Sequence, residues 1–413
     1  MNVDRIEMRR HSSNDNDYIL YIMSSSFRSH NNHSLEHALE LVHATKKPLV
    51  IILFKRQEDN ERNNEFFLAG IQNYEEVFAP ISQDVFLYDT LSDAMTTIIS
   101  KAHHVVKDRA YLNEDKAAEE NIAQIVDLAN AGFSLVESDV FVPIRIASPK
   151  EEYAASTIRK KIMSKLEDFN DPVQTTLDWL DGEADALGVL QSFILEHLER
   201  YTERNDPSND VTSHLSPYLK YGFISPLTVH NEVVFFEGES TESFLEELIV
   251  RRELAYNFVF YNNNYDTFEG ITYEWAYKTM NDHLQDEREY LYTKDDYVHF
   301  RTHDPYFNAA MKEMVHLGRM HNYMRMYWAK KIIEWSRTYQ EAYDTAISLN
   351  NYYFLDGNTP NGYTGVAWCF GKHDRAWTER PIFGKLRYMN ANGLKRKFQI
   401  DDYVSQIERL VNE

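Results

Sequence analysis

The apolar runs YILYIM, Tyr18–Met23, and PLVIILF, residues 48–54, indicate two strands that are buried on both faces. A helix-patterned stretch at residues 36–45 separates them, and a third short run, DVFLYD, follows at residues 84–89. Strands that alternate with helices in this way build a parallel sheet covered on both sides. We therefore expect a doubly wound α/β domain over residues 15–145.

The rest of the chain is predicted to be mostly helical. Two more helices, at residues 64–78 and 91–102, belong to the first domain, and no GxGxxG dinucleotide fingerprint follows its first strand. Residues 146–175 are charged and polar, which is typical of a connector with helical parts. Beyond it we expect a helical domain over residues 176–413, with apolar positions at helical spacing in 174–203, 241–261, 305–335 and 339–349.

The composition limits the classes of function. The chain has 43 basic and 65 acidic residues and a net charge of −22, which argues against a protein that coats DNA through its overall charge. Cys369 is the only cysteine, so no intramolecular disulfide can form and a reducing compartment is permitted. Neither a signal-peptide pattern nor a long apolar span is present, and we expect a cytoplasmic protein with no membrane contact.

Hydroxyl residues gather at the start of SHLSPYLKYGFISP, residues 213–226. Thr212, Ser213 and Ser216 lie just ahead of a helical stretch. Hydroxyls and free backbone N–H groups at such a place can hold a phosphate. The alternative is a helix N-cap, which requires the same residue types and which this segment alone favours.

Two tryptophans share one face of the predicted helix at residues 305–335. Trp328 and Trp335 are seven residues apart with Ile332 between them, a rise of about 10 Å along a helix. Indoles at that separation can relay an electron, but two core side chains give the same pattern, and spacing alone favours the core. Arg325 occupies a neighbouring position on the same surface.

A tight loop, DGNTPNG, interrupts the stretch SLNNYYFLDGNTPNGYTGVAWCFGKHDRAW, residues 348–377. Loops held between helices often carry functional groups. The reactive side-chain types here are Asn350, Asn351, Asp356, Trp368 and Cys369. For Asp356 the alternative is simple turn initiation.

Residues 372–397 reverse the acidic balance of the chain. Rings alternate there with basic side chains, a pattern that suits contacts with phosphates and bases; a solvated basic face is the alternative. The basic residues are Lys372, Arg375, Arg380, Lys385, Arg387, Lys395, Arg396 and Lys397.

Three stretches together resemble the signature regions of class II cyclobutane pyrimidine dimer photolyases, in the photolyase/cryptochrome family. They are SHLSPYLKYGFISP, MVHLGRMHNYMRMYWAKKIIEW and NNYYFLDGNTPNGYTGVAWCFGKHDRAW. The resemblance extends from about residue 18 to residue 404 and is strongest after residue 212.

The resemblance implies an N-terminal α/β domain that can hold an antenna chromophore and a helical domain that binds FAD. In the family the hydroxyl segment grips the flavin phosphates, the Arg325–Asp356 pair lies near the isoalloxazine ring, and Asn350 faces the flavin N5. The positions implied to bind the cofactor are Tyr201, Thr212, Ser213, His214, Leu215, Ser216, Arg252, Asn257, Arg325, Asn350 and Asp356.

The resemblance also implies light-driven repair of DNA. In the family, reduced anionic flavin passes an electron to a dimer flipped out of the duplex, and the cyclobutane ring then splits. Glu247 matches the acid that hydrogen-bonds the dimer, a role that burial would favour. The catalytic positions implied are Glu247, Asn350, Trp328 and Trp335, and the lesion- and DNA-binding positions are Glu247, Arg251, Met326, Trp368, Arg375, Lys395 and Arg396. No metal is expected.

Three positions depart from the family pattern. Phe307 stands where the middle tryptophan of the photoreduction chain is usual, Met311 where glutamine is common, and Ile22 where the first strand usually has tryptophan. Phenylalanine is much harder to oxidise than tryptophan, so we expect impaired photoreduction along this path.

Three hypotheses follow: a dimer-repairing photolyase, a cryptochrome-like photoreceptor without repair activity, and a flavin-free relative that binds nucleic acid or protein. Phe307 and the acidic charge fit the second. The lesion-pocket positions Glu247, Met326 and Trp368 favour the first, and Asn350 with the Arg325–Asp356 pair argues against the third. We expect a monomer that binds damaged DNA, and the identity of any antenna is open.

Overall fold

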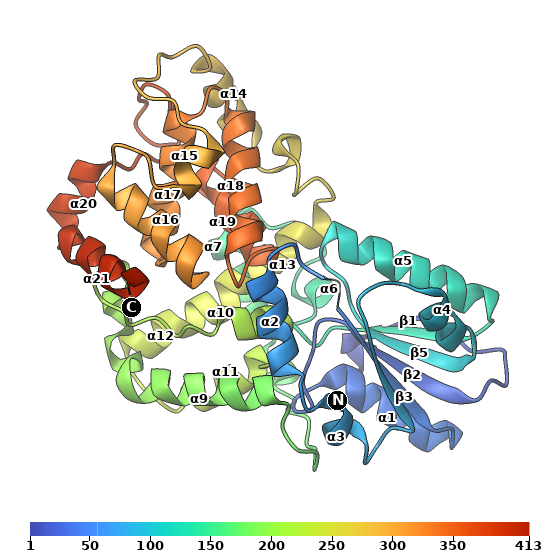
Figure 1. The fold of residues 1–413 in the computed structure, drawn as a ribbon. Helices are drawn as coiled ribbons and strands as arrows, with labels where there is room; N and C mark the ends of the chain where they lie inside the picture. Colours follow the sequence, from blue (N-terminus) through green and yellow to red (C-terminus); the bar gives the residue numbers. More distant parts are fainter. Residues whose placement is uncertain (56, 413) are drawn as a thin grey trace.

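The protein is described by a computed structural model that covers residues 1–55 and 57–412. Figure 1 shows a helix-covered sheet beside a larger group of helices. The sheet has six strands in the order β1-β6-β5-β2-β3-β4. The strands are β1 Ile6–Arg10, β2 Tyr18–Met23, β3 Leu49–Phe54, β4 Asp84–Tyr88, β5 Ala102–Asp108 and β6 Gly132–Val136. The expected doubly wound sheet is confirmed. Strand β1 pairs antiparallel with β6, so the sheet begins before the expected boundary at residue 15.

Side chains of the central strand β2 alternate between two cores. Ile19, Tyr21 and Met23 pack on the face covered by α1 (His33–Thr45) and α2 (Glu61–Gly70). Leu20 and Ile22 pack on the opposite face, which α4 (Asp93–Ser100) and α5 (Asn113–Leu128) cover. Because both faces are buried, every position of this strand after Tyr18 is apolar and inaccessible to water.

Several expected helices are divided in the structure. Residues 64–78 contain the end of α2 and a separate helix, α3 (Tyr74–Phe78), and the helix expected at 91–102 ends at Ser100, because β5 begins at Ala102. The helix expected at 305–335 is two helices, α16 (Pro305–Leu317) and α17 (Asn322–Trp335). Gly318 ends α16 in a left-handed conformation, φ +67°, which glycine adopts without strain.

The remaining helices form the second part of the molecule and the segment that leads to it. They are α6 Ile144–Ala147, α7 Ala155–Met163, α8 Leu166–Phe169, α9 Asp181–Glu196, α10 Ser216–Tyr221, α11 Pro226–Val233, α12 Glu239–Leu245, α13 Arg252–Tyr261, α14 Glu274–Asp282, α15 Lys294–Val298, α18 Tyr339–Tyr353, α19 Pro360–Cys369, α20 Ala391–Lys397 and α21 Ile400–Asn412. Short 3₁₀ turns occur at Val3–Arg5, Leu198–Asn205 and Phe268–Gly270. Ile158, Ile162 and Phe169 of the connector pack in one core with α9, so this segment is part of the helical body.

The two parts meet closely beside α10. Gly222 has φ +67°, and a Cβ placed there would lie 2.0 Å from the carbonyl oxygen of Ser25, so only glycine permits this approach. Arg28 donates hydrogen bonds to the carbonyl oxygens of Gly222 at 3.0 Å and Ser138 at 2.8 Å. These hydrogen bonds and the close backbone approach attach the end of the sheet to the helices.

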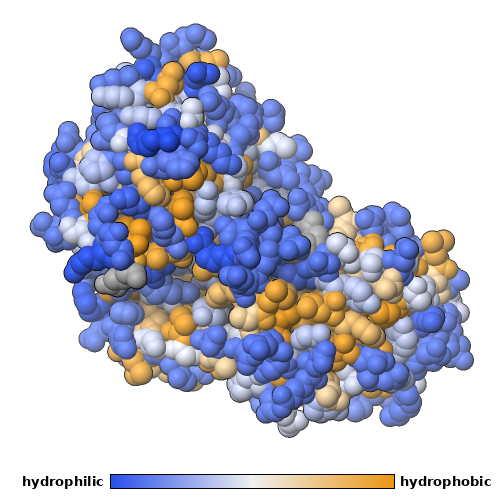
Figure 2. All heavy atoms as spheres, viewed as in Figure 1, coloured by the Kyte–Doolittle hydropathy of each residue, from blue (hydrophilic) through white to orange (hydrophobic). Residues whose placement is uncertain are grey.

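Polar side chains cover most of the face shown in Figure 2, and apolar ones gather in a band across its lower middle. Among the described residues, no helix combines the length and the apolar character that crossing a membrane requires.

Candidate active site

A cavity of about 600 Å³ opens among the helices of the second part. Its walls come from segments far apart in the sequence, including the residues before α10, helix α17, the α18–α19 loop and helix α21. Most of the expected site residues line it: Tyr201, Thr212, Ser213, His214, Leu215, Ser216, Glu247, Arg251, Arg325, Met326, Trp328, Asn350, Asp356 and Trp368.

The hydroxyl segment lines this cavity. The N-cap residue of α10 is Leu215, which makes no side-chain capping bond, so the capping interpretation of Thr212 and Ser216 is wrong. Ser213 Oγ accepts from the backbone N–H of Leu215 at 3.4 Å. Thr212, Ser213 and Ser216 all line the cavity, where hydroxyl and backbone N–H groups can receive a phosphate.

His214 is held by two charged neighbours beside the hydroxyls. Arg319 Nη1 donates to His214 Nδ1 at 3.0 Å, which leaves the other ring nitrogen, Nε2, to donate to Asp210 Oδ1 at 2.9 Å. Burial raises the pKa of Asp210, but the hydrogen bond from His214 and the charge of Arg319 outweigh burial and lower it. The carboxylate is thus kept ionised and orients the imidazole.

The expected Arg325–Asp356 pair forms in the wall of the cavity. Arg325 Nη2 lies 2.9 Å from Asp356 Oδ1 and 3.1 Å from Oδ2, and the guanidinium stacks 3.8 Å from the ring centre of Phe354. Asn350, at the end of α18, also lines the cavity and is buried. The turn interpretation of Asp356 is too narrow, because its carboxylate is a charged partner of α17.

Glu247 lies in a short π-helical stretch, Glu246–Arg251, between α12 and α13. Such irregular turns occur frequently at functional sites because they redirect side chains. The expected burial is absent: the Glu247 side chain is 40% exposed, and Arg204 donates to its Oε1 at 3.2 Å. The guanidinium of Arg204 also stacks 4.5 Å from the ring centre of Tyr201. Glu247 therefore reaches the cavity with one oxygen already bonded.

Trp368 connects the cavity to the basic segment. Arg387 stacks between two indoles, 4.7 Å from the ring centre of Trp368 and 4.3 Å from that of Trp377, and Asp374 accepts from its Nε at 3.0 Å. Arg375 lies 5.1 Å over the Trp377 ring. Alternating rings and guanidinium groups thus extend from the cavity to the surface.

Lys395 and Arg396 lie apart from the cavity, on the exposed helix α20. Within the basic segment Lys372 is not solvated, because it is buried and pairs with Glu151.

The two expected relay tryptophans lie in different places. Trp328 is buried and lines the cavity, with its Nε1 3.1 Å from the Met311 sulfur. Trp335 is buried outside the cavity, and Phe307 meets it edge to face at 5.1 Å.

Two residues expected to bind the cofactor do not line the cavity. Arg252 donates to the carbonyl oxygen of Asp139 at 2.6 Å and to the Tyr256 hydroxyl at 2.9 Å. Asn257 accepts from the backbone N–H of Glu152 at 2.7 Å and donates to the carbonyl oxygen of Lys150 at 3.0 Å. Both side chains thus tie α13 to neighbouring segments, with their polar groups engaged away from the cavity.

One wall of the cavity was not predicted from the sequence. Helix α21 contributes Tyr403, Gln406, Ile407 and Leu410, and Tyr403 donates to the buried carboxyl of Glu313 at 2.7 Å. Burial raises the pKa of Glu313. The signal available was the amphipathic pattern of residues 400–412, but an amphipathic helix at a chain end does not reveal which cavity it covers.

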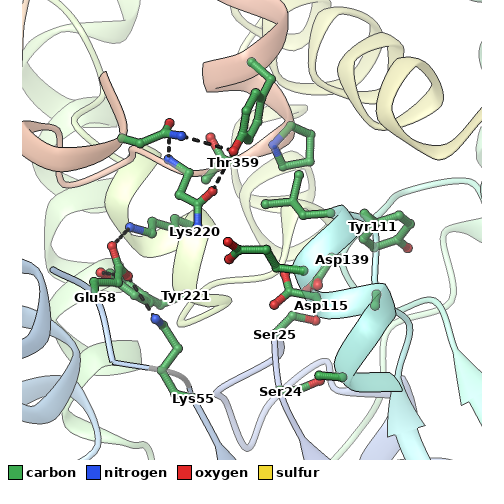
Figure 3. Close-up of a pocket in the computed structure, with 18 of the residues that line it drawn as sticks. Ser24, Ser25, Lys55, Glu58, Tyr111, Asp115, Asp139, Lys220, Tyr221 and Thr359 are labelled. Carbon is green, nitrogen blue, oxygen red and sulfur yellow. Dashed lines mark hydrogen bonds and ion pairs between the residues drawn. The ribbon is translucent and has the colours of Figure 1, made fainter. Parts of the chain in front are cut away.

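A second cavity, of about 690 Å³, lies where the parallel strands end against the helices (Figure 3). Ser24, Lys55 and Lys107, at or just after the ends of β2, β3 and β5, line it, and in open α/β sheets this edge is the usual ligand position. Glu58 is bonded there by Lys55 at 2.9 Å and by Lys220 at 2.7 Å. Burial raises the pKa of Glu58, but the two lysines outweigh it and lower the pKa to about 2.

Comparisons with known proteins agree with the geometry. Residues 19–178 match the family model described as DNA photolyase. The chain is 41% identical to a deoxyribodipyrimidine photo-lyase of Methanothermobacter thermautotrophicus over 96% of both proteins, and 35% identical to one of Oryza sativa over 96% of this chain and 88% of the relative. An archaeal photolyase structure from Sulfolobus tokodaii with two FAD molecules has a TM-score of 0.69 at 16% identity, covering 94% of this chain and 89% of that one. The chain belongs to the DNA photolyase family.

Proposed function

We propose that this protein splits cyclobutane pyrimidine dimers in DNA by light-driven electron transfer, with FAD bound in the 600 Å³ cavity. The observation that carries the proposal is the meeting of two residue sets in one cavity. The Thr212–Ser216 segment, Asn350 and the Arg325–Asp356 pair suit a flavin dinucleotide, and Glu247 with Trp368 suits a dimer.

The residues that line the cavity fit FAD. Hydroxyl and backbone N–H groups of the Thr212–Ser216 segment would hold the phosphates, beside the cationic Arg319. The Arg325–Asp356 pair and Asn350 would hold the ring system through its polar edge. Reduced FAD, when bound and illuminated, supplies the electron that breaks the cyclobutane ring.

The chain's own groups would orient the lesion. Glu247 offers a partly exposed carboxylate whose second oxygen is free of Arg204, so it can bond a pyrimidine carbonyl edge if it carries or shares a proton. Met326 and Trp368 supply an apolar wall against which a flipped base can stack.

Contacts to the DNA backbone are proposed for the basic segment. Arg375, Lys395 and Arg396 are exposed, which suits phosphate contacts in a protein whose total charge is −22. Arg251 lies at the cavity rim and is 48% exposed, so it can contact the strand on either side of the lesion.

The resemblance to class II enzymes and the second cavity support an antenna chromophore at the ends of the strands, of undefined identity. Reduced anionic FAD as the active form, a monomeric state and a cytoplasmic location stay predictions.

A photoreceptor that lacks repair activity is the second candidate. It is favoured by Phe307, which lies against Trp335 and stands where the family usually has the middle tryptophan of the photoreduction chain. Cavity residues that suit a dimer have no purpose in a sensor, so repair is the better-supported function.

A repair assay on purified protein with chemically reduced flavin tests the proposal. An oligonucleotide that contains a thymine dimer is illuminated with near-ultraviolet to blue light, beside a dark control. Light-dependent return of the thymine absorbance is expected. Bound FAD without dimer splitting would refute repair and favour the photoreceptor.

A further inference from the structure

The wall between the two cavities contains neighbouring asparagines that face opposite sides. Asn350 lines the 600 Å³ cavity, whereas Asn351 lines the 690 Å³ cavity with Asn358 and Tyr363. Four hydrogen bonds join these residues, and their directions can be deduced, because one donor is a backbone N–H.

The backbone N–H of Asn358 sets the orientation of the Asn351 amide. It donates to Asn351 Oδ1 at 3.1 Å, and a backbone N–H cannot accept. Asn351 Nδ2 must then donate to the Tyr363 hydroxyl at 3.1 Å, and that hydroxyl donates to Asn358 Oδ1 at 3.1 Å. Asn358 has φ +52°, a left-handed conformation that asparagine tolerates, and this turn belongs to the loop that brings its N–H to Asn351.

The oriented Asn351 in turn sets the orientation of Asn350. Asn350 Nδ2 donates to the same Oδ1 of Asn351 at 3.0 Å, so the carbonyl end of the Asn350 amide is left for the cavity. Gly362 leaves room for this arrangement, since a Cβ there would lie 2.8 Å from Asn350 Nδ2. Asn350 is only 3% exposed, so water competes little for the amide.

We propose that Asn351 is a positioning residue, which holds the Asn350 amide with its oxygen toward the cavity so that the site accepts a hydrogen bond from bound flavin and does not donate one. This inference rests on the proposed function. Reduced flavin carries an N–H at N5, whereas oxidised flavin has a lone pair there, so a fixed acceptor favours the reduced form. An Asn350 amide that is free to turn can donate to the oxidised form instead.

The test is the midpoint potential of the bound flavin, measured spectroscopically against a reference dye. Asn351→Leu removes the acceptor, and we expect the ratio of reduced to oxidised flavin at a given potential to fall about tenfold, a potential about 30 mV lower for a two-electron couple. Asn351→Ser supplies a hydroxyl that can accept or donate, so a smaller decrease in the same direction is expected. This second variant decides the question if Asn351→Leu does not fold.

Two matched variants separate positioning from general damage. Asn358→Gly keeps the orienting backbone N–H and tolerates positive φ. Tyr363→Phe removes the acceptor of Asn351 Nδ2 but leaves the bond from the Asn358 N–H to Asn351 Oδ1, so both variants should keep the wild-type potential. An unchanged potential in both Asn351 variants with flavin bound would overturn the inference, as would an equal shift in all four variants. A wild-type protein that binds no FAD would instead refute the proposed function, and this inference with it.

Discussion

Replacing Glu253 by glutamine is expected to change the stability of the protein in a pH-dependent way. Relative to wild type, the variant should be more stable at alkaline pH than at acid pH. Glu253 is 3% exposed on α13 and accepts hydrogen bonds from the backbone N–H groups of Phe141 and Val142, just after the sheet. Burial raises its pKa to about 7, against the ordinary 4.5, and the hydrogen bonds and Arg252 offset burial only in part. The folded protein therefore favours the neutral carboxyl.

The direction of this pH dependence follows from proton linkage. Because the folded pKa is raised, the stabilisation from the neutral carboxyl is complete below about pH 4.5 and is lost as the pH rises through about 7. A difference of about 2.5 pH units at about 1.4 kcal/mol per unit gives about 3 kcal/mol. For 413 residues the entropy of unfolding is about 0.9 kcal/mol/K, so this corresponds to about 3 °C in Tm.

The assay compares the Tm of wild type and Glu253→Gln at pH 4.5 and pH 8.5 by differential scanning calorimetry. The glutamine NH₂ group lacks a defined partner and costs stability equally at both pH values, so the diagnostic quantity is the change in the Tm difference between them. Glu242→Gln is the matched control, because Glu242 is exposed on the adjacent helix α12. An equal Tm difference at both pH values for Glu253→Gln would refute the reasoning.

The remaining predictions concern the proposed active site. Glu247→Ala should lower the quantum yield of dimer repair without loss of flavin absorbance; loss of the flavin would make Glu247 a cofactor contact instead. Phe307→Trp should speed flavin photoreduction under blue light, since the position lies 5.1 Å from Trp335, and an unchanged rate would mean that electrons take another path. Asp356→Asn removes the charge that pairs with Arg325 at 2.9 Å. FAD titration of the apoprotein should then show binding about ten- to a hundredfold weaker, consistent with about 1.5–3 kcal/mol for a hydrogen bond to a charged group. Wild-type affinity would show that the pair does not hold the cofactor.

Some elements were readable from the sequence because their local pattern has one physical explanation. The central strands β2 and β3 are buried on both faces, so their apolar runs are nearly continuous. The edge strand β1, IEMRR, is only half buried and carries charges, so its pattern does not differ from that of a loop. The break at Gly318 also escaped prediction, since the helical spacing of apolar residues continues on both sides of it.

The residue types of the candidate site could be predicted from three motifs, because a tight loop and a hydroxyl cluster have local signatures, whereas the Arg325–Asp356 pair was expected only from the family resemblance. Their meeting in one cavity depends on contacts between segments more than a hundred residues apart, such as the packing that brings Ser213 and Asn350 to one space. The roles of Arg252 and Asn257 could not be predicted from the nearby sequence, because their hydrogen-bond partners lie on other segments. The sequence by itself determines which functional groups the protein has. Burial and long-range packing decide which of these groups face the cavity, because the direction of a side chain depends on neighbours that only the folded chain supplies.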